Sequence, residues 1–206
     1  MPLDPALQPT IPGYPAHSST KERILTSALV SLAAQGFYGT SIRVIAEGAG
    51  VNSATLYSHF PSKQHILAEL VSRGSHELLG RITTALGNAT APTDRLDAII
   101  RATTIAHAEH PLLAIVTNRE MSALETELAG PATAPTVEAA RLLRAVLAQG
   151  VTDGLFDIVN LEITAHALEG MAQLVPFWFD PDKDKPEHLA RQYVGIARRI
   201  VQARVR

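Results

Sequence analysis

The chain has 206 residues, a formal net charge of −2 and no cysteine, so we expect neither a disulfide framework nor a thiolate metal site. Hydrophobic residues make up 46% of the chain and charged residues 18%, which is typical of a globular protein with a substantial core. No apolar run approaches the roughly 20 residues of a membrane span, and we expect a cytoplasmic protein with no membrane partner.

The first predicted helix follows a proline-rich N-terminus. We expect residues 1–19 to form a flexible arm, because prolines recur there and no apolar stretch of the signal-peptide kind is present. Residues 20–35 carry apolar side chains at helical spacing, which predicts an amphipathic helix with one buried stripe. Gly36 suits the left-handed residue that ends such a helix.

Residues 40–60 predict two short helices joined by a glycine turn. Thr40 is the expected N-cap of a helix that runs to about Glu47. Asn52 is the expected N-cap of a second helix, which ends before Pro61. This is the form of a helix-turn-helix, which presents its second helix to the major groove of DNA.

The side chains of this motif suit contacts with DNA. Leu56 must face the core, which turns small polar side chains outward and lets the helix backbone approach the bases. Donor groups at the helix starts and flanks can contact phosphates or a guanine edge. The candidate DNA-binding residues are Thr40, Ser41, Arg43, Asn52, Ser53, Ala54, Thr55, Tyr57, Ser58, His59 and Lys63. A glycine turn between short helices also occurs in proteins that never bind DNA, and Tyr57 and Phe60 could be core aromatics.

The rest of the chain predicts a longer helical body. Loops rich in proline, glycine or charge are expected at residues 130–135 and 180–186. With no strand pattern of convincing length, the expected fold class is all-α with about nine helices. Apolar periodicity places the remaining helices over residues 62–86, 94–109, 112–128, 136–150, 161–179 and 187–205.

The residues around the glycine turn resemble a known family. Residues 40–63 and the Gly-Phe pair before them closely resemble the N-terminal domain of TetR-family transcriptional regulators, over about residues 20–70. Ser53 and Ala54 stand where that family often has a lysine and a glycine. The missing lysine concerns one backbone contact and not the fold.

The resemblance implies an all-helical homodimer that binds a palindromic operator in double-stranded DNA. It also implies a variable C-terminal domain that binds a small effector. Most members of the family are repressors, and the effector usually releases the DNA. The implied division is a flexible arm at 1–19, a helix-turn-helix DNA-binding domain at 20–66, and a helical effector-binding and dimerisation domain at 67–206.

We expect the homodimer interface on the last two predicted helices, at 161–179 and 187–205, because both are apolar along a stripe and lie near the chain end. The candidate interface residues are Leu161, Ala165, Leu168, Ala172, Val175, Tyr193, Ile196 and Ile200. Both stripes could instead belong to the core of a single chain.

An effector pocket is expected among the helices between residues 94 and 179, where polar groups stand in apolar surroundings. The candidate ligand-binding residues are His107, Asn118, Met121, His166, Met171, Phe177 and Trp178. Each could instead be an ordinary core or surface residue. Residues 110–120 also resemble a segment of TetR regulators of lipid and steroid catabolism, whose effectors are acyl-CoA thioesters. We therefore expect a small apolar or amphipathic effector, with an acyl-CoA-like molecule as one form.

Two other functions remain open from the residues alone. His107 and His110 share a helix face and could hold a metal with His166, which would suit a helical enzyme. However, the chain has no His-Glu-x-x-His pattern, no paired Glu-x-x-His motif and no glycine phosphate loop. A helical interaction module without DNA binding is the second alternative. We expect a ligand-responsive transcriptional repressor with no catalytic residue, no metal and no cofactor.

Overall fold

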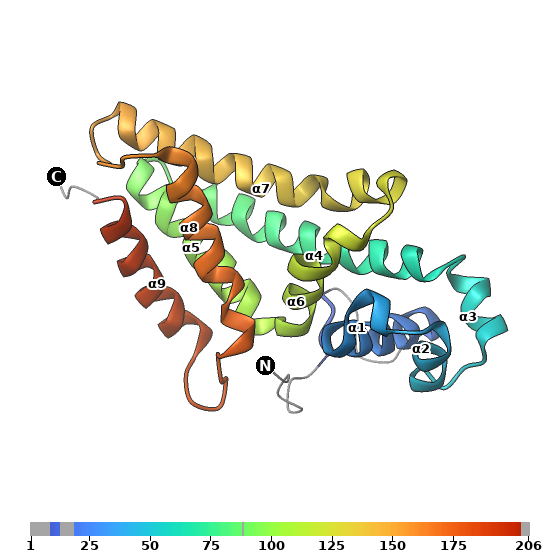
Figure 1. Ribbon diagram of the computed structural model, residues 1–206. Helices are drawn as coiled ribbons and strands as arrows, with labels where there is room; N and C mark the ends of the chain where they lie inside the picture. The colour runs from blue at the N-terminus through green and yellow to red at the C-terminus, as the bar shows by residue number, and fades with distance from the viewer. Residues whose placement is uncertain (1–8, 13–18, 88, 203–206) are drawn as a thin grey trace. The chain divides into compact units, whose positions relative to one another are not determined.

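The computed structural model describes residues 9–12, 19–87 and 89–202, and its regular structure is helical throughout (Figure 1). These residues form nine α-helices and two short 3-10 helices, and no strand occurs among them. The predicted all-α fold class is confirmed. The arm predicted at 1–19 lies mostly outside the described residues, although Ile11 within it is buried.

Four helices make up the N-terminal part of the chain. Their bounds are α1 (Thr20–Gly39), α2 (Ile42–Gly48), α3 (Ser53–His59) and α4 (Lys63–Leu86). α1 begins with a capping box: the Ser19 hydroxyl accepts from the Glu22 amide, and the Glu22 carboxylate accepts from the Ser19 amide at 2.8 Å. These reciprocal bonds satisfy two amides that the first turn of a helix leaves unpaired.

Five helices follow along the chain. Their bounds are α5 (Pro92–Glu109), α6 (Pro111–Glu120), α7 (Thr126–Thr152), α8 (Leu161–Gln173) and α9 (Pro186–Ile200). The 3-10 helix Met121–Ala123 follows α6, and the 3-10 helix Val175–Phe177 follows α8. The helix predicted over 187–205 corresponds to α9, and residues 203–206 lie outside the described part of the chain.

Three predicted boundaries in this region are wrong. The helix expected over 112–128 ends at Glu120, where the 3-10 helix follows. The loop expected at 130–135 is helical, because α7 starts at Thr126 and continues through Pro131 and Pro135. Ala129, Ala132 and Ala134 favour the helix locally, and each proline removes one amide donor from it. The helix expected over 161–179 ends at Gln173, because Pro176 has no amide to continue the α-helical pattern.

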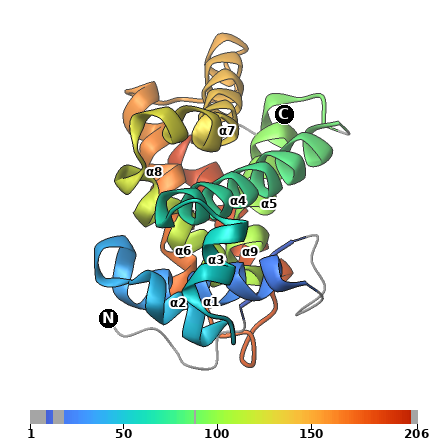
Figure 2. The same ribbon diagram turned by 90° about the vertical axis from the view of Figure 1, so that its right-hand side faces the viewer.

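The first of two compact units comprises residues 1–76 and 110–134. In it α1 packs against α2 and α6, and both Figure 1 and Figure 2 draw α2 and α3 as short helices beside α1. Apolar side chains of the first four helices are removed from solvent and hold the short helices in place. The largest of them are Ile24, Leu25, Leu29, Leu32, Ile45, Leu56, Ile66, Leu67 and Leu70.

The second unit comprises residues 77–109 and 135–206. α5 runs along α9 and also packs against α8 (Figure 1). The core between these helices includes Leu96, Leu147, Leu168 and Ala197, each at most 1% exposed. The apolar faces predicted for these helices are therefore largely buried within one chain.

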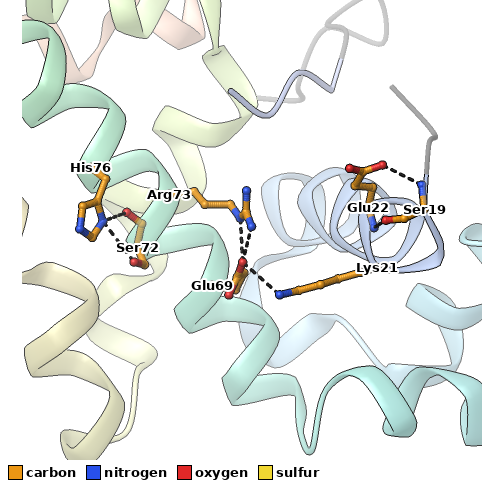
Figure 3. A network of polar contacts seen from close by, with 7 residues as sticks. All are labelled: Ser19, Lys21, Glu22, Glu69, Ser72, Arg73 and His76. Atoms are coloured by element: carbon orange, nitrogen blue, oxygen red, sulfur yellow. Dashed lines mark hydrogen bonds and ion pairs between the residues drawn. The ribbon is translucent and has the colours of Figure 1, made fainter. Parts of the chain in front are cut away.

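An ion-pair network joins α1 to α4 inside the first unit (Figure 3). The Glu69 carboxylate lies 3.4 Å from the Lys21 ammonium and accepts from the Arg73 Nε at 2.9 Å. Burial raises the pKa of the Glu69 carboxyl, but the bonds and charges of Arg73 and Lys21 outweigh burial and hold that pKa below its ordinary value. The charged form of Glu69 therefore stabilises the packing of α4 on α1.

We expect Glu69→Gln to lower the free energy of unfolding by about 1 kcal/mol at neutral pH, because it removes one charge shared by two partners. Since folding lowers this pKa, the stabilisation is complete above the pKa of the unfolded chain, about 4.3, and is lost as the pH falls through the folded value. Urea unfolding of both proteins at about pH 7, 5 and 3 measures the difference.

The control is Asp182→Asn, an exposed acid whose carboxylate has no ion-pair partner among the described residues. It should change stability by less than about 0.5 kcal/mol. A Glu69→Gln difference that is as large at pH 3 as at pH 7 would contradict the assignment.

Candidate nucleic-acid interface

The turn between α2 and α3 depends on one glycine with a left-handed backbone. Gly50 has a φ of 66°, and nothing lies within 4 Å of the position where a Cβ would stand. The glycine is therefore required for its backbone conformation and not for space. Beside it, the Val51 amide donates to the Ala46 carbonyl at 3.0 Å, which fixes the angle at which the chain enters α3.

α3 presents a small polar face to solvent. Asn52 caps the helix as predicted, and its side-chain oxygen accepts from the Thr55 amide at 2.8 Å. Leu56 is 0% exposed and anchors the helix, as predicted, and Phe60 is also buried, as the core alternative proposed. Of the remaining candidates, Ser53, Ala54, Tyr57, Ser58 and His59 are exposed and Thr55 is half-buried. Their contacts with DNA stay predictions.

The start of α2 differs from the prediction by one residue. Thr40 is only 2% exposed, and its hydroxyl donates to the Gly36 carbonyl at 2.8 Å. Ser41 is the N-cap instead, and its exposed hydroxyl oxygen accepts from the Val44 amide at 3.2 Å. The predicted role of Thr40 as a helix cap and phosphate donor is therefore wrong, because its side chain is used inside the protein.

Arg43 projects freely from α2. Its side chain is 84% exposed, and its Nε donates to Glu47 at 2.7 Å. An exposed i,i+4 ion pair of this kind is weak, so exchanging Glu47 for a phosphate would cost little. The predicted DNA contact of Arg43 is compatible with this geometry and stays a prediction.

Lys63 joins the start of α4 to the end of α1. Its ammonium donates to the Phe37 carbonyl at 2.6 Å and to the Thr40 carbonyl at 2.7 Å, and it lies 4.1 Å from the centre of the Phe37 ring. Burial lowers the pKa of this ammonium. Two of its three N–H donors are thus used inside the protein, which leaves one for the predicted phosphate contact.

The candidate ligand-binding residues are divided between the two units. Asn118 and Met121 belong to the first unit, and the other five belong to the second. His107 is buried, and its Nδ1 donates to the Ala172 carbonyl at 2.8 Å. Burial lowers the pKa of His107 more than this bond raises it. The imidazole is therefore held neutral as part of the core.

The remaining candidates of the second unit lie along the end of α8 and beyond it. Met171 packs against the core, and its carbonyl accepts from the Tyr193 hydroxyl at 3.3 Å. Trp178 is 53% exposed and stacks on the Tyr193 ring, with 6.4 Å between centroids, while Phe177 is half-buried. The His166 side chain is 70% exposed and lies near Glu169. Within this unit, the structure does not gather the five into one pocket.

A groove-like cavity of about 720 Å³, largely open to solvent, lies between α4 and α5 in the second unit, and none of the predicted ligand residues lines it. Small side chains on the facing helices leave this space open, and charged side chains also line it. Its lining comprises Glu77, Gly80, Arg81, Thr84, Ala85, Asp94, Asp97, Ala98, Arg101, Ala102 and Ile105. The small residues on both helices were the available sequence signal, but helical spacing does not reveal which two helices face one another.

Most of the predicted interface residues are core residues of a single chain. Ala165, Leu168, Ala172 and Val175 are at most 1% exposed, and Tyr193 is 9% exposed. These five cannot form an interface because their own unit already covers them, which is the alternative left open by the sequence. Leu161 is half-buried, whereas Ile196 and Ile200 are exposed.

Two further observations concern the alternative functions. In the part of the chain that is described, no group of three His, Cys, Asp or Glu side chains is placed to hold a metal ion. His110, one of the proposed metal ligands, has its ring nitrogen 2.7 Å from the Thr10 hydroxyl. None of the helices described is both long enough and apolar enough to span a bilayer.

An exposed, capped helix-turn-helix in an all-helical chain is the arrangement found in a class of DNA-binding proteins. Residues 24–70 match the model for bacterial regulatory proteins of the tetR family, and residues 89–201 match that for the tetracyclin repressor-like C-terminal domain. The second match alone covers more than half of the chain. The chain belongs to the TetR family and is a transcriptional regulator, not an enzyme.

Similar proteins support the same placement. The HTH-type transcriptional repressor KstR2 of Mycolicibacterium smegmatis is 26% identical over 194 residues, covering 92% of this chain and 93% of that protein. A tetR-family regulatory protein from Rhodococcus RHA1 has a TM-score of 0.82 and 26% identity, covering 91% of this chain and all of that one. AibR, in a complex described with isovaleryl coenzyme A and operator DNA, has a TM-score of 0.76 and 23% identity, covering 86% and 97%.

We expect Lys63→Ala to lower the free energy of unfolding by about 1–2 kcal/mol, because the Phe37 and Thr40 carbonyl oxygens lose the bonds that they accept from the ammonium. If the third N–H contacts a phosphate, as predicted, the slope of log K against log salt should also fall by about one unit. Urea unfolding and DNA binding at several salt concentrations measure the two effects separately.

Lys183→Ala serves as the control, since its side chain is 83% exposed and pairs with Asp180, three residues earlier. An unchanged salt slope in Lys63→Ala would remove Lys63 from the phosphate contacts and leave it a purely internal role.

Proposed function

We propose that this protein is a transcriptional repressor that binds a palindromic operator as a homodimer and leaves it when a small effector binds. The observation that carries the proposal is the exposed face of α3, which is anchored by the buried Leu56 and held at a fixed angle by the Gly50 turn. A rigid short helix with small side chains is the form that fits the major groove.

The groups on this face suit reading and positioning roles. Ser53 and Ala54 at the start of α3 are short enough to let the helix backbone approach base edges. The Tyr57 hydroxyl and the His59 ring can donate to phosphates beside the groove. The Ser41 oxygen accepts from a backbone amide, which leaves its own O–H to donate to a phosphate near the start of α2.

The proposed homodimer uses a different face of α8 from the predicted one and keeps the predicted Ile196 and Ile200 of α9. On α8, Ile163, Ala167, Gly170 and Leu174 recur at helical spacing and lie outside the core, with Ile163 69% and Leu174 59% exposed. Ile196 and Ile200 form a similar exposed stripe on α9, at 42% and 37%. Exposed apolar stripes of this kind are typical of subunit interfaces, and an isologous pair matches a palindromic site.

The proposed effector is an acyl thioester of coenzyme A. The similarity to AibR, which is described with isovaleryl coenzyme A, supports this class, as does the resemblance of residues 110–120 to regulators of lipid catabolism. The cavity between α4 and α5 falls within the usual size of small-molecule sites, roughly 300–1,000 Å³. Arg101, exposed at that cavity, is available to a phosphate of the ligand.

We expect a duplex selected from a random pool by the wild-type protein to contain an inverted repeat and to shift in a native gel. Tyr57→Ala should weaken this binding about tenfold or more, because it removes a phosphate contact and a flank of the reading helix. Adding isovaleryl coenzyme A to the wild-type complex should release the DNA, whereas coenzyme A alone should do so less.

Val137→Ala, which trims an exposed apolar side chain of α7, is the control and should bind as the wild type does. Failure of the wild type to enrich any duplex would favour the interaction module instead. Release by neither ligand would reject this effector class and leave operator binding intact.

We expect the wild-type protein to have twice the 22.1 kDa mass of one chain in solution at micromolar concentration. Ile163→Asp should shift it to a monomer, because the new carboxylate would be desolvated in the apolar contact. Sedimentation velocity measures the mass. Val151→Asp on α7, another exposed valine, should leave the dimer intact. A wild type that sediments as a monomer would contradict the proposed interface.

A further inference from the structure

α1 is broken near its end, and the break leaves backbone groups without helical partners. Gly36 has φ 73° and ψ 174°, far from helical values, although the helix resumes briefly afterwards. This conformation turns the Phe37 amide away from the Ala33 carbonyl, which it would meet in a regular helix. Buried backbone groups that lose such a bond need another partner.

The last two residues of α6 provide those partners. The Glu120 carboxylate accepts from the Phe37 amide at 2.9 Å. The Arg119 guanidinium donates to the Leu32 carbonyl at 2.9 Å and to the Ala33 carbonyl at 2.8 Å. Arg119 and Glu120 also bond to each other at 2.6 Å. The pair therefore fills the break in α1 and replaces its missing hydrogen bonds on both sides.

The Glu120 carboxylate fits closely into the break in α1. Glu120 is only 8% exposed, and its buried charge is compensated by Arg119 and by the amide it accepts from. A Cβ at Gly36 would lie 3.4 Å from a Glu120 carboxylate oxygen, and it would also strain the positive φ. That distance is an ordinary van der Waals contact, so the glycine is required for its backbone conformation and not for space.

The same short segment is held from its other side by α4. The Lys63 ammonium donates to the Phe37 and Thr40 carbonyl oxygens, and the Thr40 hydroxyl donates to the Gly36 carbonyl. Ser41 follows immediately as the cap of α2. Residues 36–41 therefore set the direction in which the chain leaves α1 for the helix-turn-helix, and polar groups from α6 and α4 fix that direction.

A second tie lies just beyond α6. Gln64, in the first turn of α4, donates from its amide nitrogen to the Ala123 carbonyl at 2.9 Å. Its amide oxygen accepts from the Glu125 backbone at 3.2 Å. Both ends of the reading motif, the exit from α1 and the entry to α4, are thus bonded to the chain segment 119–125.

We propose that Arg119 and Glu120 are positioning residues for the DNA-reading helix, and that their bonds to the break in α1 form a latch that holds residues 36–41 in one conformation. The inference rests on the proposed function, because it concerns the orientation in which α3 meets an operator.

The latch differs from a general stabilising contact in one measurable way. Specific binding needs the reading helix in one orientation, whereas non-specific binding depends on phosphate charge and tolerates several. Loss of the latch should therefore weaken binding to the selected duplex more than binding to a scrambled duplex. Partial unfolding would weaken both in proportion to the folded fraction.

The experiment compares Glu120→Gln and Glu120→Ala with the wild type and with Glu138→Gln, which alters an exposed Arg–Glu pair on α7. Affinities for the selected and scrambled duplexes are measured at a temperature well below thermal unfolding. We expect Glu120→Ala to lose about tenfold in specific affinity with non-specific affinity within about twofold, and Glu120→Gln to lose less because it keeps the acceptor. Glu138→Gln should match the wild type.

Hydrogen exchange of the DNA-free proteins provides a readout that does not depend on an operator. In Glu120→Ala, exchange should accelerate at residues 36–41 and in α2 and α3, and stay unchanged in α9. The latch is overturned if both Glu120 variants keep the wild-type ratio of affinities, if both affinities fall in parallel, or if exchange at 36–41 is unaltered. Failure of the wild type to select any duplex would reject operator binding, and the exchange result would still decide whether the latch exists.

Discussion

The backbone carbonyl oxygens at the end of α1 are the groups on which the arrangement of the N-terminal unit depends. The Leu32 and Ala33 carbonyls accept hydrogen bonds from the Arg119 guanidinium. The Phe37 and Thr40 carbonyls accept hydrogen bonds from the Lys63 ammonium. A buried carbonyl without a donor is costly, so two cations from different helices are drawn to the same few residues. Helices as short as α2 and α3 are not stable alone. Their orientation is therefore set by the way the chain leaves the end of α1.

Local chemistry was sufficient to predict the reading motif. Asn52 as a cap, Leu56 as an inward anchor and a glycine at the turn each follow from rules that act over a few residues. Either Thr40 or Ser41 could cap α2 by those rules, but the Thr40 hydroxyl donates instead to the Gly36 carbonyl four residues earlier, which leaves Ser41 as the cap. The bond between Glu120 and the break in α1 could not be predicted, because no local pattern links Glu120 to an amide 83 positions earlier.

The helical body was predicted in outline and misjudged in detail for two physical reasons. α8 carries apolar residues on opposite faces, so spacing alone could not decide that Leu168 lies in the core while Ile163 faces solvent. Two prolines in α7 predicted a loop, but the helix continues through both of them. Which helices face one another, and hence where a cavity opens, depends on packing between distant segments.

The buried imidazole between α5 and α8 has a consequence for tolerance of acid. His107 donates to the Ala172 carbonyl, which cannot accept from Pro176 because proline has no amide hydrogen. Burial lowers the pKa of the ring and disfavours its charged form. An unfolded chain would take up a proton there below about pH 6.5, whereas the folded chain resists doing so. Acidification therefore favours the unfolded chain, and the junction of these two helices is a weak point of the fold in mildly acidic surroundings.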